Sequence, residues 1–75
     1  MQITITKLAD LRVGDRPISF NGRRYNRPLT VAAELGPIEP GSPVQGVRLD
    51  APGAGIEWVF YPSQMDGRAL VIERN

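Results

Sequence analysis

The dipeptide Asn21-Gly22 restricts the fold of this chain more than any other feature of its sequence. Asn-Gly between runs of alternating apolar and polar residues favours a type I′ turn, because both turn positions need a positive φ angle. A two-residue turn places Phe20 opposite Arg23 on neighbouring strands. The sequence therefore predicts an antiparallel hairpin around this dipeptide.

The alternation continues on both sides of the turn. Ile18, Phe20 and Tyr25 fall on one face, and steps of two lead from Tyr25 to Leu35. This spacing predicts one long strand, bent or edge-exposed at Pro28, where the ring lacks the N–H that a sheet needs. The cluster of prolines and glycines from Gly36 to Pro43 is expected to be a loop.

Two-residue alternation also marks four other segments of the chain. The side chains expected to face the core there are Ile3, Ile5, Val47, Leu49, Ile56, Trp58, Phe60, Leu70 and Ile72. A slip of register in the last strand would turn Val71 inward instead. The segment Ile56–Tyr61 is the most apolar of these strands, and we expect it to form the centre of the core.

Short interruptions separate these strands. Leu8 and Leu11 are three residues apart, which predicts one helical turn, and Val13-Gly14-Asp15 predicts a tight turn. Pro62–Met65 fits a single 3₁₀-like helical turn, and Asp66-Gly67 predicts a chain reversal.

These elements fit one small domain over residues 1–75, which cannot contain a disulfide because the chain has no cysteine. Closing an antiparallel sheet hides its edges and encloses one core. We therefore expect an all-β fold, a small SH3-like antiparallel β-barrel of about five to six short strands with one short helical turn. Its first and last strands should lie side by side.

Two stretches, "LRVGDRPISFNGRRY" and "GIEWVFYPSQM", resemble short β-barrel proteins of actinobacteria and their phages. Those proteins share a "VGD" turn, a strand, an Asn-Gly turn and a second strand, and later a strand that ends in "W-x-F-Y-P". The resemblance implies the barrel fold and a small accessory protein of a phage or mobile element. It transfers no functional residue to this chain.

The residue types present argue against catalysis. The chain has no histidine and no cysteine, so the commonest general base and the usual zinc ligands are missing. Its acidic residues are spread singly, and its serines have no local base partner. We expect no enzymatic activity, no cofactor and no metal. No apolar run is long enough to span a membrane, and the N-terminus lacks a signal-peptide core, so we expect a cytoplasmic protein, in the host cytoplasm if phage-encoded.

The hairpin carries the densest group of arginines. Arg23, Arg24 and Arg27 flank Tyr25, and guanidinium groups beside an exposed aromatic ring are typical of nucleic-acid contacts. Strand alternation instead turns Tyr25 toward the core and leaves Arg24 on the outer face. The net charge of +1 also argues against binding that depends on many phosphate contacts.

The other face of the apolar strand forms a second candidate. Val59 and Tyr61 alternate with Trp58 and Phe60, so they lie on the outer face if Trp58 and Phe60 point inward. Exposed apolar residues of this kind mark protein interfaces. The sequence equally allows a loop or a helical turn to cover them.

Two loops are interpreted as structural. The glycine-rich segment "APGAGIE" has no following helix and no Lys-Ser/Thr, so it is not a phosphate-binding loop. The proline-rich segment "ELGPIEPGSP" could dock as an extended ligand, but no flanking arginine supports this, and we interpret it as a stiff connector.

The sequence thus predicts a non-enzymatic interaction module that binds another protein through one face of a barrel. If the source is a phage, this partner would be a host protein. The expected contact residues are Arg23, Arg24, Arg27, Val59 and Tyr61. The alternative is a nucleic-acid-binding barrel that uses the arginine-rich hairpin, residues 21–27. Pairing at an open strand edge would also allow a homodimer.

Overall fold

The alternating pattern corresponds to short antiparallel strands in a computed structural model, which describes residues 1–51 and 57–75. Within these residues the strands are β1 (Gln2–Ile5), β2 (Arg16–Phe20), β3 (Arg23–Arg24), β4 (Thr30–Pro37), β5 (Gln45–Asp50), β6 (Glu57–Phe60) and β7 (Leu70–Glu73). The helical segments are η1 (Leu8–Asp10) and α1 (Pro62–Met65). The expected all-β class is confirmed, with one strand more than expected, and helical turns are present at both positions where the sequence predicted them. The predicted glycine-rich loop and Ile56 lie outside the described residues.

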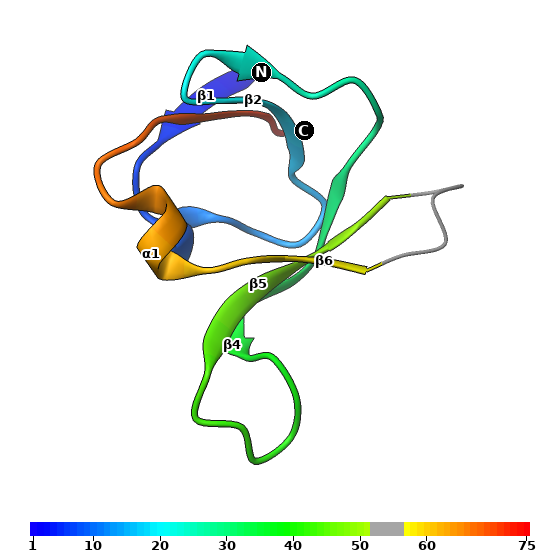
Figure 1. Cartoon of the computed structure of the whole chain (residues 1–75). Helices are drawn as coiled ribbons and strands as arrows, with labels where there is room; N and C mark the ends of the chain where they lie inside the picture. The colour runs from blue at the N-terminus through cyan, green and yellow to red at the C-terminus, as the bar shows by residue number, and fades with distance from the viewer. Residues whose placement is uncertain (52–56) are drawn as a thin grey trace.

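The strands form two antiparallel sheets, and the pairing between the described residues does not close into a barrel. One sheet has the order β1-β7-β2-β3 and the other has the order β4-β5-β6. Figure 1 shows the first sheet above the second. Buried side chains from both sheets belong to one core cluster. The first and last strands are neighbours, as predicted, with Ile3 opposite Ile72.

The turn at Asn21-Gly22 is confirmed. The φ angles are 51° at Asn21 and 84° at Gly22, the positive values that a type I′ turn requires. Phe20 pairs with Arg23 in the resulting hairpin of β2 and β3. This hairpin fixes which side chains of its two strands face the core.

The single long strand predicted from Tyr25 to Leu35 is wrong. β3 ends at Arg24, and strand pairing resumes only at Thr30, after the segment that contains Pro28. The register of β4 against β5 then shifts twice, between Val31 and Ala33 and again between Ala33 and Gly36. The first irregularity changes the face that later residues occupy, and the second one restores it. Leu35 therefore returns to the face of Val31, but it is exposed whereas Val31 is buried.

The loop predicted from Gly36 to Pro43 begins later than expected. Gly36 pairs with Gly46, and Pro37 pairs with Gln45, so β4 continues through the first two residues of the breaker cluster. Pro37 is tolerated because it is the last residue of β4, which lies at an edge of its sheet. The remaining residues form the loop of the β4–β5 hairpin.

The core lies between the two sheets. The predicted inward residues of the described strands are largely correct: Ile5, Val47, Leu49, Phe60, Leu70 and Ile72 are all buried. Leu8 of the first helical turn and Leu11 directly after it are also buried. The expected central position of the apolar strand is wrong, because β6 is an edge strand and the completely buried side chains lie on β5 and β7.

A buried ion pair joins the end of the chain to the turn before β2. Asp15 is 2% exposed, and Arg74 donates hydrogen bonds from Nε to Oδ1 (2.9 Å) and from Nη2 to Oδ2 (2.7 Å). The backbone N–H of Arg12 donates to the same carboxylate at 2.8 Å. The hydrogen bonds from Arg74 hold the pKa of Asp15 below its usual value.

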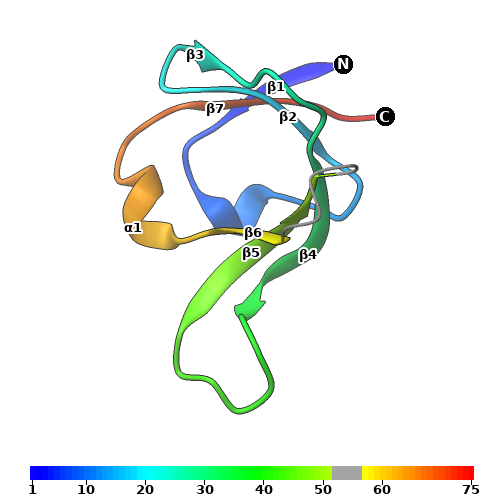
Figure 2. The same cartoon turned by 45° about the vertical axis from the view of Figure 1, so that its right-hand side comes forward.

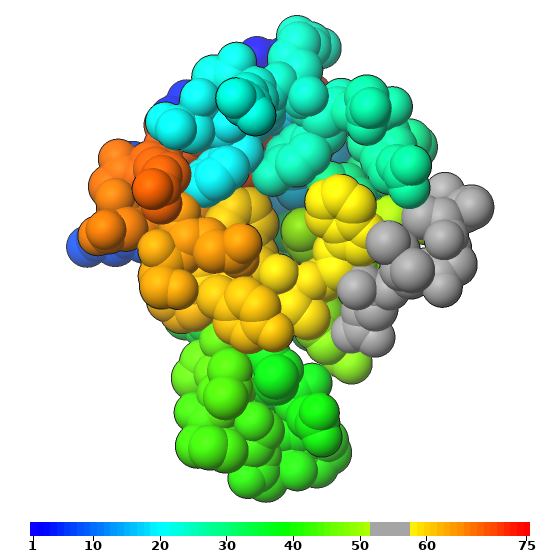
Figure 3. All heavy atoms as spheres, viewed as in Figure 1, coloured from blue at the N-terminus to red at the C-terminus, as the bar shows by residue number. Residues whose placement is uncertain are grey.

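The β4–β5 hairpin extends beyond the body of the molecule. Figures 1 and 2 show its loop projecting away from both sheets, and Figure 3 shows its atoms (green) as a separate lobe. We call residues 35–45 the hairpin arm. No residue of the arm is fully buried, and none belongs to the core cluster. Within the described part of the chain, no helix is long and apolar enough to cross a membrane.

Candidate functional site

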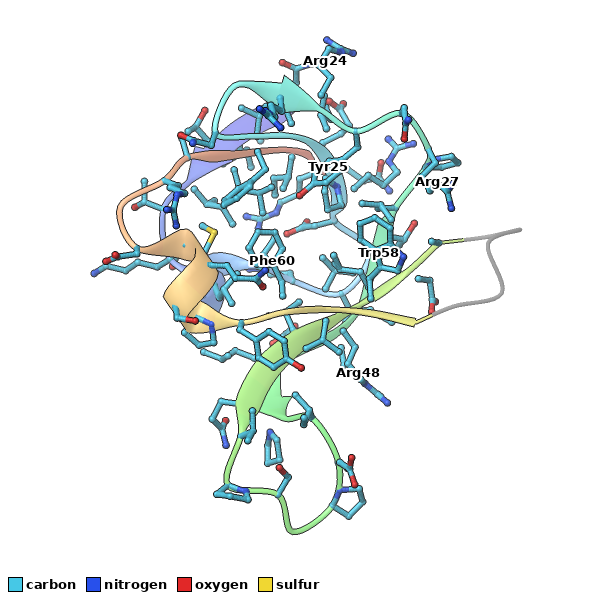
Figure 4. The ribbon with its side chains drawn as sticks, in the orientation of Figure 1. Arg24, Tyr25, Arg27, Arg48, Trp58 and Phe60 are labelled. Atoms are coloured by element: carbon cyan, nitrogen blue, oxygen red, sulfur yellow. The ribbon has the colours of Figure 1, made fainter. Side chains whose placement is uncertain are left out.

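The structure separates the five predicted contact residues into two groups. Arg23 and Arg24 form β3, and Arg27 follows in the segment that leads to β4. Val59 lies on β6 in the other sheet, and Tyr61 directly follows that strand. Figure 4 shows Arg24 and Arg27 above the core and β6 below it. The arginines therefore do not form a rim around Val59 and Tyr61.

Strand pairing defines the outer face of the β4-β5-β6 sheet. Val47 pairs with Phe60, and both side chains are buried in the core. Arg48 pairs with Val59, and these two side chains point to the opposite side of the sheet, because successive residues of a strand alternate between faces. Arg48 points away from the core in Figure 4. Val59 is therefore on the outer face, as its alternation predicted.

Val59 is partly covered by the hairpin arm. A Cβ atom added to Gly46 would lie 2.7 Å from Val59 Cγ1 and 3.0 Å from Ile38 Cγ2. The Val59 and Ile38 side chains therefore converge above Gly46, where any larger residue would displace them. The sequence left open whether another segment covers Val59. Ile38 of the β4–β5 loop covers part of this half-buried side chain.

Tyr61 remains exposed on the same side of the sheet. Its side chain is 37% exposed, and alternation from Val59 directs it to the outer face. Its backbone N–H donates to Gln64 Oε1 at 2.8 Å, and its carbonyl accepts from the Gln64 N–H at 2.9 Å. Pro62 begins α1 with a φ angle that suits a first helical turn. The aromatic ring is thus presented from a fixed backbone.

The hairpin arm adds further apolar side chains to this face. The Ile38 N–H donates to the Val44 carbonyl at 3.1 Å, which brings these two residues opposite each other. Val44 has the same strand alternation as Gly46 and Arg48, and it is 44% exposed. We call Ile38, Val44, Val59 and Tyr61 the outer apolar surface. A groove of about 460 Å³ beside it is lined by Pro37, Ile38, Glu39, Pro40 and Arg48.

The loop of the arm is a compact turn. The Ser42 N–H donates to the Glu39 carbonyl at 3.0 Å, and the Val44 N–H donates to Ser42 Oγ at 3.1 Å. An extended polyproline segment would not make these bonds, so the proline-rich stretch does not form an extended ligand here. The sequence interpretation as a stiff connector missed Ile38 and Val44. The available signal was one apolar residue, Ile38, inside the cluster of breakers and another, Val44, directly after it.

The arginines of the first group are exposed. Across residues 1–51 and 57–75, the side chains of Arg23, Arg24 and Arg27 form no hydrogen bond or ion pair. Tyr25 between them is half-buried, and its burial raises the pKa of the phenol. Tyr25 packs against the core cluster, as strand alternation predicted.

The buried acidic residue is not arranged for chemistry. Both carboxylate oxygens of Asp15 accept hydrogen bonds from Arg74, and one of them also accepts from the backbone of Arg12. These bonds hold the group ionised and leave it little capacity to accept a proton. Among the described residues, no three acidic side chains gather where a metal ion could bind.

Comparisons with protein-family models, with curated proteins and with solved structures find no match to this chain.

Proposed function

We propose that this protein is a non-enzymatic interaction module that docks onto another protein through its outer apolar surface. The observation that carries the proposal is the hairpin arm, which displays Ile38 and Val44 beside Val59 and Tyr61 without contributing to the core. Small domains need most of their apolar residues for folding. Apolar residues held on a projecting arm are therefore better explained by a partner than by stability.

The geometry of the surface supports tight docking. Tyrosine is enriched among the residues that dominate binding energies, because its ring buries a large area with few rotatable bonds. Tyr61 is fixed by its bonds to Gln64, and Ile38 and Val59 hold each other in place above Gly46. A surface that is already ordered loses less conformational entropy when it binds.

We also propose that the two sheets represent an SH3-like barrel. Three features support this: the pairing of the first and last strands, the helical turn just before the last strand, and the strongly bent path from β3 into β4. The resemblance to small β-barrels of actinobacteria and their phages supports a cytoplasmic accessory protein. Its partner would be a host protein if the gene belongs to a phage.

Self-association is the second form of this proposal. β1 pairs only with β7 among the described strands, so its other edge is free to pair with another chain. A homodimer formed in this way would leave the outer apolar surface available. Light scattering across a concentration series would detect the homodimer, because the average mass would rise from that of one chain to that of two as the concentration increases.

The test is capture of a partner from a lysate of the organism that carries the gene. Tyr61→Asp places a charge in the outer apolar surface and should abolish capture of a protein that the wild-type chain enriches. Ser63→Asp adds the same charge two residues away on an exposed part of α1 and should retain capture. Thermal unfolding of both variants checks that the fold is intact.

Three outcomes would contradict the proposal. They are unchanged capture by folded Tyr61→Asp, equal loss of capture in Ser63→Asp, and no protein enriched by the wild-type chain.

A further inference from the structure

A second surface lies where the free edge of β6 faces the β2–β3 hairpin. Three aromatic side chains, Phe20, Tyr25 and Trp58, pack there against the core cluster that includes Phe60. The rings of Phe20 and Phe60 pack edge to face, with centroids 5.0 Å apart and an interplanar angle of 81°. Phe60 is buried, whereas Phe20, Tyr25 and Trp58 are half-buried. The cluster thus closes the core on one side and presents ring surface to solvent on the other.

The space-filling view supports this arrangement. The segment around Phe20 and Tyr25 (cyan to teal) and the β6 segment (yellow) meet on the face shown in Figure 3. Figure 4 shows Tyr25 directed toward the side of the molecule that holds Trp58 and Phe60. We call Phe20, Tyr25 and Trp58 the aromatic face.

Trp58 has an unused hydrogen-bond donor. Its indole Nε1 is buried, and it has no hydrogen-bond partner among the residues that the structure describes. An indole N–H can only donate, and buried donors normally find an acceptor.

Two of the free arginines flank the aromatic face. Arg23 pairs with Phe20, so the two side chains lie on the same face of the sheet. Arg27 lies beyond Tyr25 on the side of Trp58 in Figure 4. Arg24 pairs with Ser19 and points away from the aromatic face. Asp50 alternates with the buried Leu49 and so lies on the outer face of its sheet.

From this juxtaposition we propose that the aromatic face, with Arg23 and Arg27, binds single-stranded nucleic acid. Exposed rings stack with unpaired bases, and guanidinium groups bind the phosphates between them. A duplex keeps its bases stacked inside and cannot use the rings. Two phosphate contacts also agree with the net charge of +1, because this mode depends on stacking rather than on a large basic surface.

The single tryptophan of the chain provides the measurement. Titration with a short single-stranded oligothymidylate at low salt should quench the fluorescence of Trp58. Anisotropy of a labelled oligothymidylate gives a second readout of the same binding. Two phosphate contacts predict a slope of log affinity against log salt of about −1.4, from about −0.7 for each contact on a single strand.

Variants of the face separate stacking from charge. Arg23→Gln combined with Arg27→Gln should bring the salt slope close to zero. Arg24→Gln is the matched control on the opposite face, and it should leave affinity and slope unchanged. Tyr25→Leu keeps an apolar side chain against the core and should weaken binding about tenfold through loss of stacking.

Several results would overturn the proposal. They are no binding of oligothymidylate by either readout, equal affinity for a duplex of the same length, equal affinity for polyglutamate, and equal losses in Arg24→Gln and the double variant. Equal binding of polyglutamate would instead indicate an acidic protein ligand. The outcome is independent of the proposed docking function, because Tyr61→Asp should bind oligothymidylate normally.

Discussion

The body of this protein and its hairpin arm use apolar residues in opposite ways. In the body, Leu70 and Ile72 of β7 and Val47 of β5 are completely buried between the two sheets. In the arm, Leu35 is 37% exposed and Val44 is 44% exposed, although both are as apolar as their buried counterparts. The arm is held by backbone pairing with β5 and by the packing of Ile38 above Gly46.

This difference shows that the arm is not needed to complete the core. Apolar side chains stabilise a fold in proportion to the surface that they remove from water. Residues of the arm remove less surface from water than residues of the body when the isolated chain folds, so substitutions there should change stability less. The same substitutions in the body should change it strongly. Matched pairs of residues in the two regions test this comparison directly.

The largest expected effect is in the body. Leu70→Ala removes a side chain with no exposed surface and should lower the free energy of unfolding by about 3 kcal/mol. Leu35→Ala makes the same change in the arm and should lower it by less than about 1 kcal/mol. Urea unfolding followed by circular dichroism measures both. Equal losses in the two variants would show that the arm belongs to the folding core.

The buried ion pair should give the next largest effect. Asp15→Asn leaves the Arg74 guanidinium without its carboxylate, and we expect a loss of about 2 kcal/mol, less than for a completely buried pair because Arg74 is partly exposed. Asp66→Asn changes an exposed carboxylate and is the control. If Asp15→Asn lowered the free energy of unfolding no more than Asp66→Asn, the ion pair with Arg74 would not stabilise the fold.

The same carboxylate should make stability depend on pH. Arg74 lowers the pKa of Asp15 in the folded state, so the unfolded chain takes up a proton more readily. The stabilisation is therefore fully present above the unfolded value of about 4 and is lost as pH falls through the folded pKa. Asp15→Asn should flatten this acid dependence, which urea unfolding between neutral and acidic pH would reveal.

Sequence analysis predicted the parts of the fold that depend on local patterns. Asn21-Gly22 determines its own turn, and alternation correctly turned Leu70 and Ile72 inward. It failed where a register changes, because the irregularities in β4 come from pairing with β5 rather than from the sequence of β4 itself. It also missed the pairing of Asp15 with Arg74, which are 59 residues apart.

The candidate surfaces show the same limit. Alternation on β6 correctly separated Val59 from the buried Phe60. The contact of Ile38 with this face depends on how the arm folds back over Gly46, and a run of breakers gives no sign of it. Grouping Arg23 with Tyr61 was reasonable for a closed barrel, but Arg23 lies in one sheet and Tyr61 directly follows a strand of the other.

A smaller effect is expected where the arm joins the body. Gly46→Ala would place its Cβ against Val59, Ile38 and the Phe60 carbonyl, so these groups must move apart. Overpacking of this kind should destabilise the fold by about 1.5 kcal/mol. Gly36→Ala is the matched control, since its Cβ would meet only the Glu34 carbonyl at 3.8 Å. A neutral Gly46→Ala in urea unfolding would mean that the arm can swing away from Val59 freely.

The smallest effect on stability should come from the tip of the arm. Val44→Ser removes apolar surface that already faces water, so the free energy of unfolding should change by less than about 0.5 kcal/mol. Val47→Ser makes the same change three residues later on the buried face of β5 and should cost about 2 kcal/mol. Partner capture should respond in the opposite order, with Val44→Ser weakening it and Val47→Ser leaving it unchanged while the chain remains folded. If Val44→Ser altered neither stability nor capture, the exposed valine would contribute to neither the core nor partner binding. The exposed apolar residues of the arm would then not be explained by a docking function.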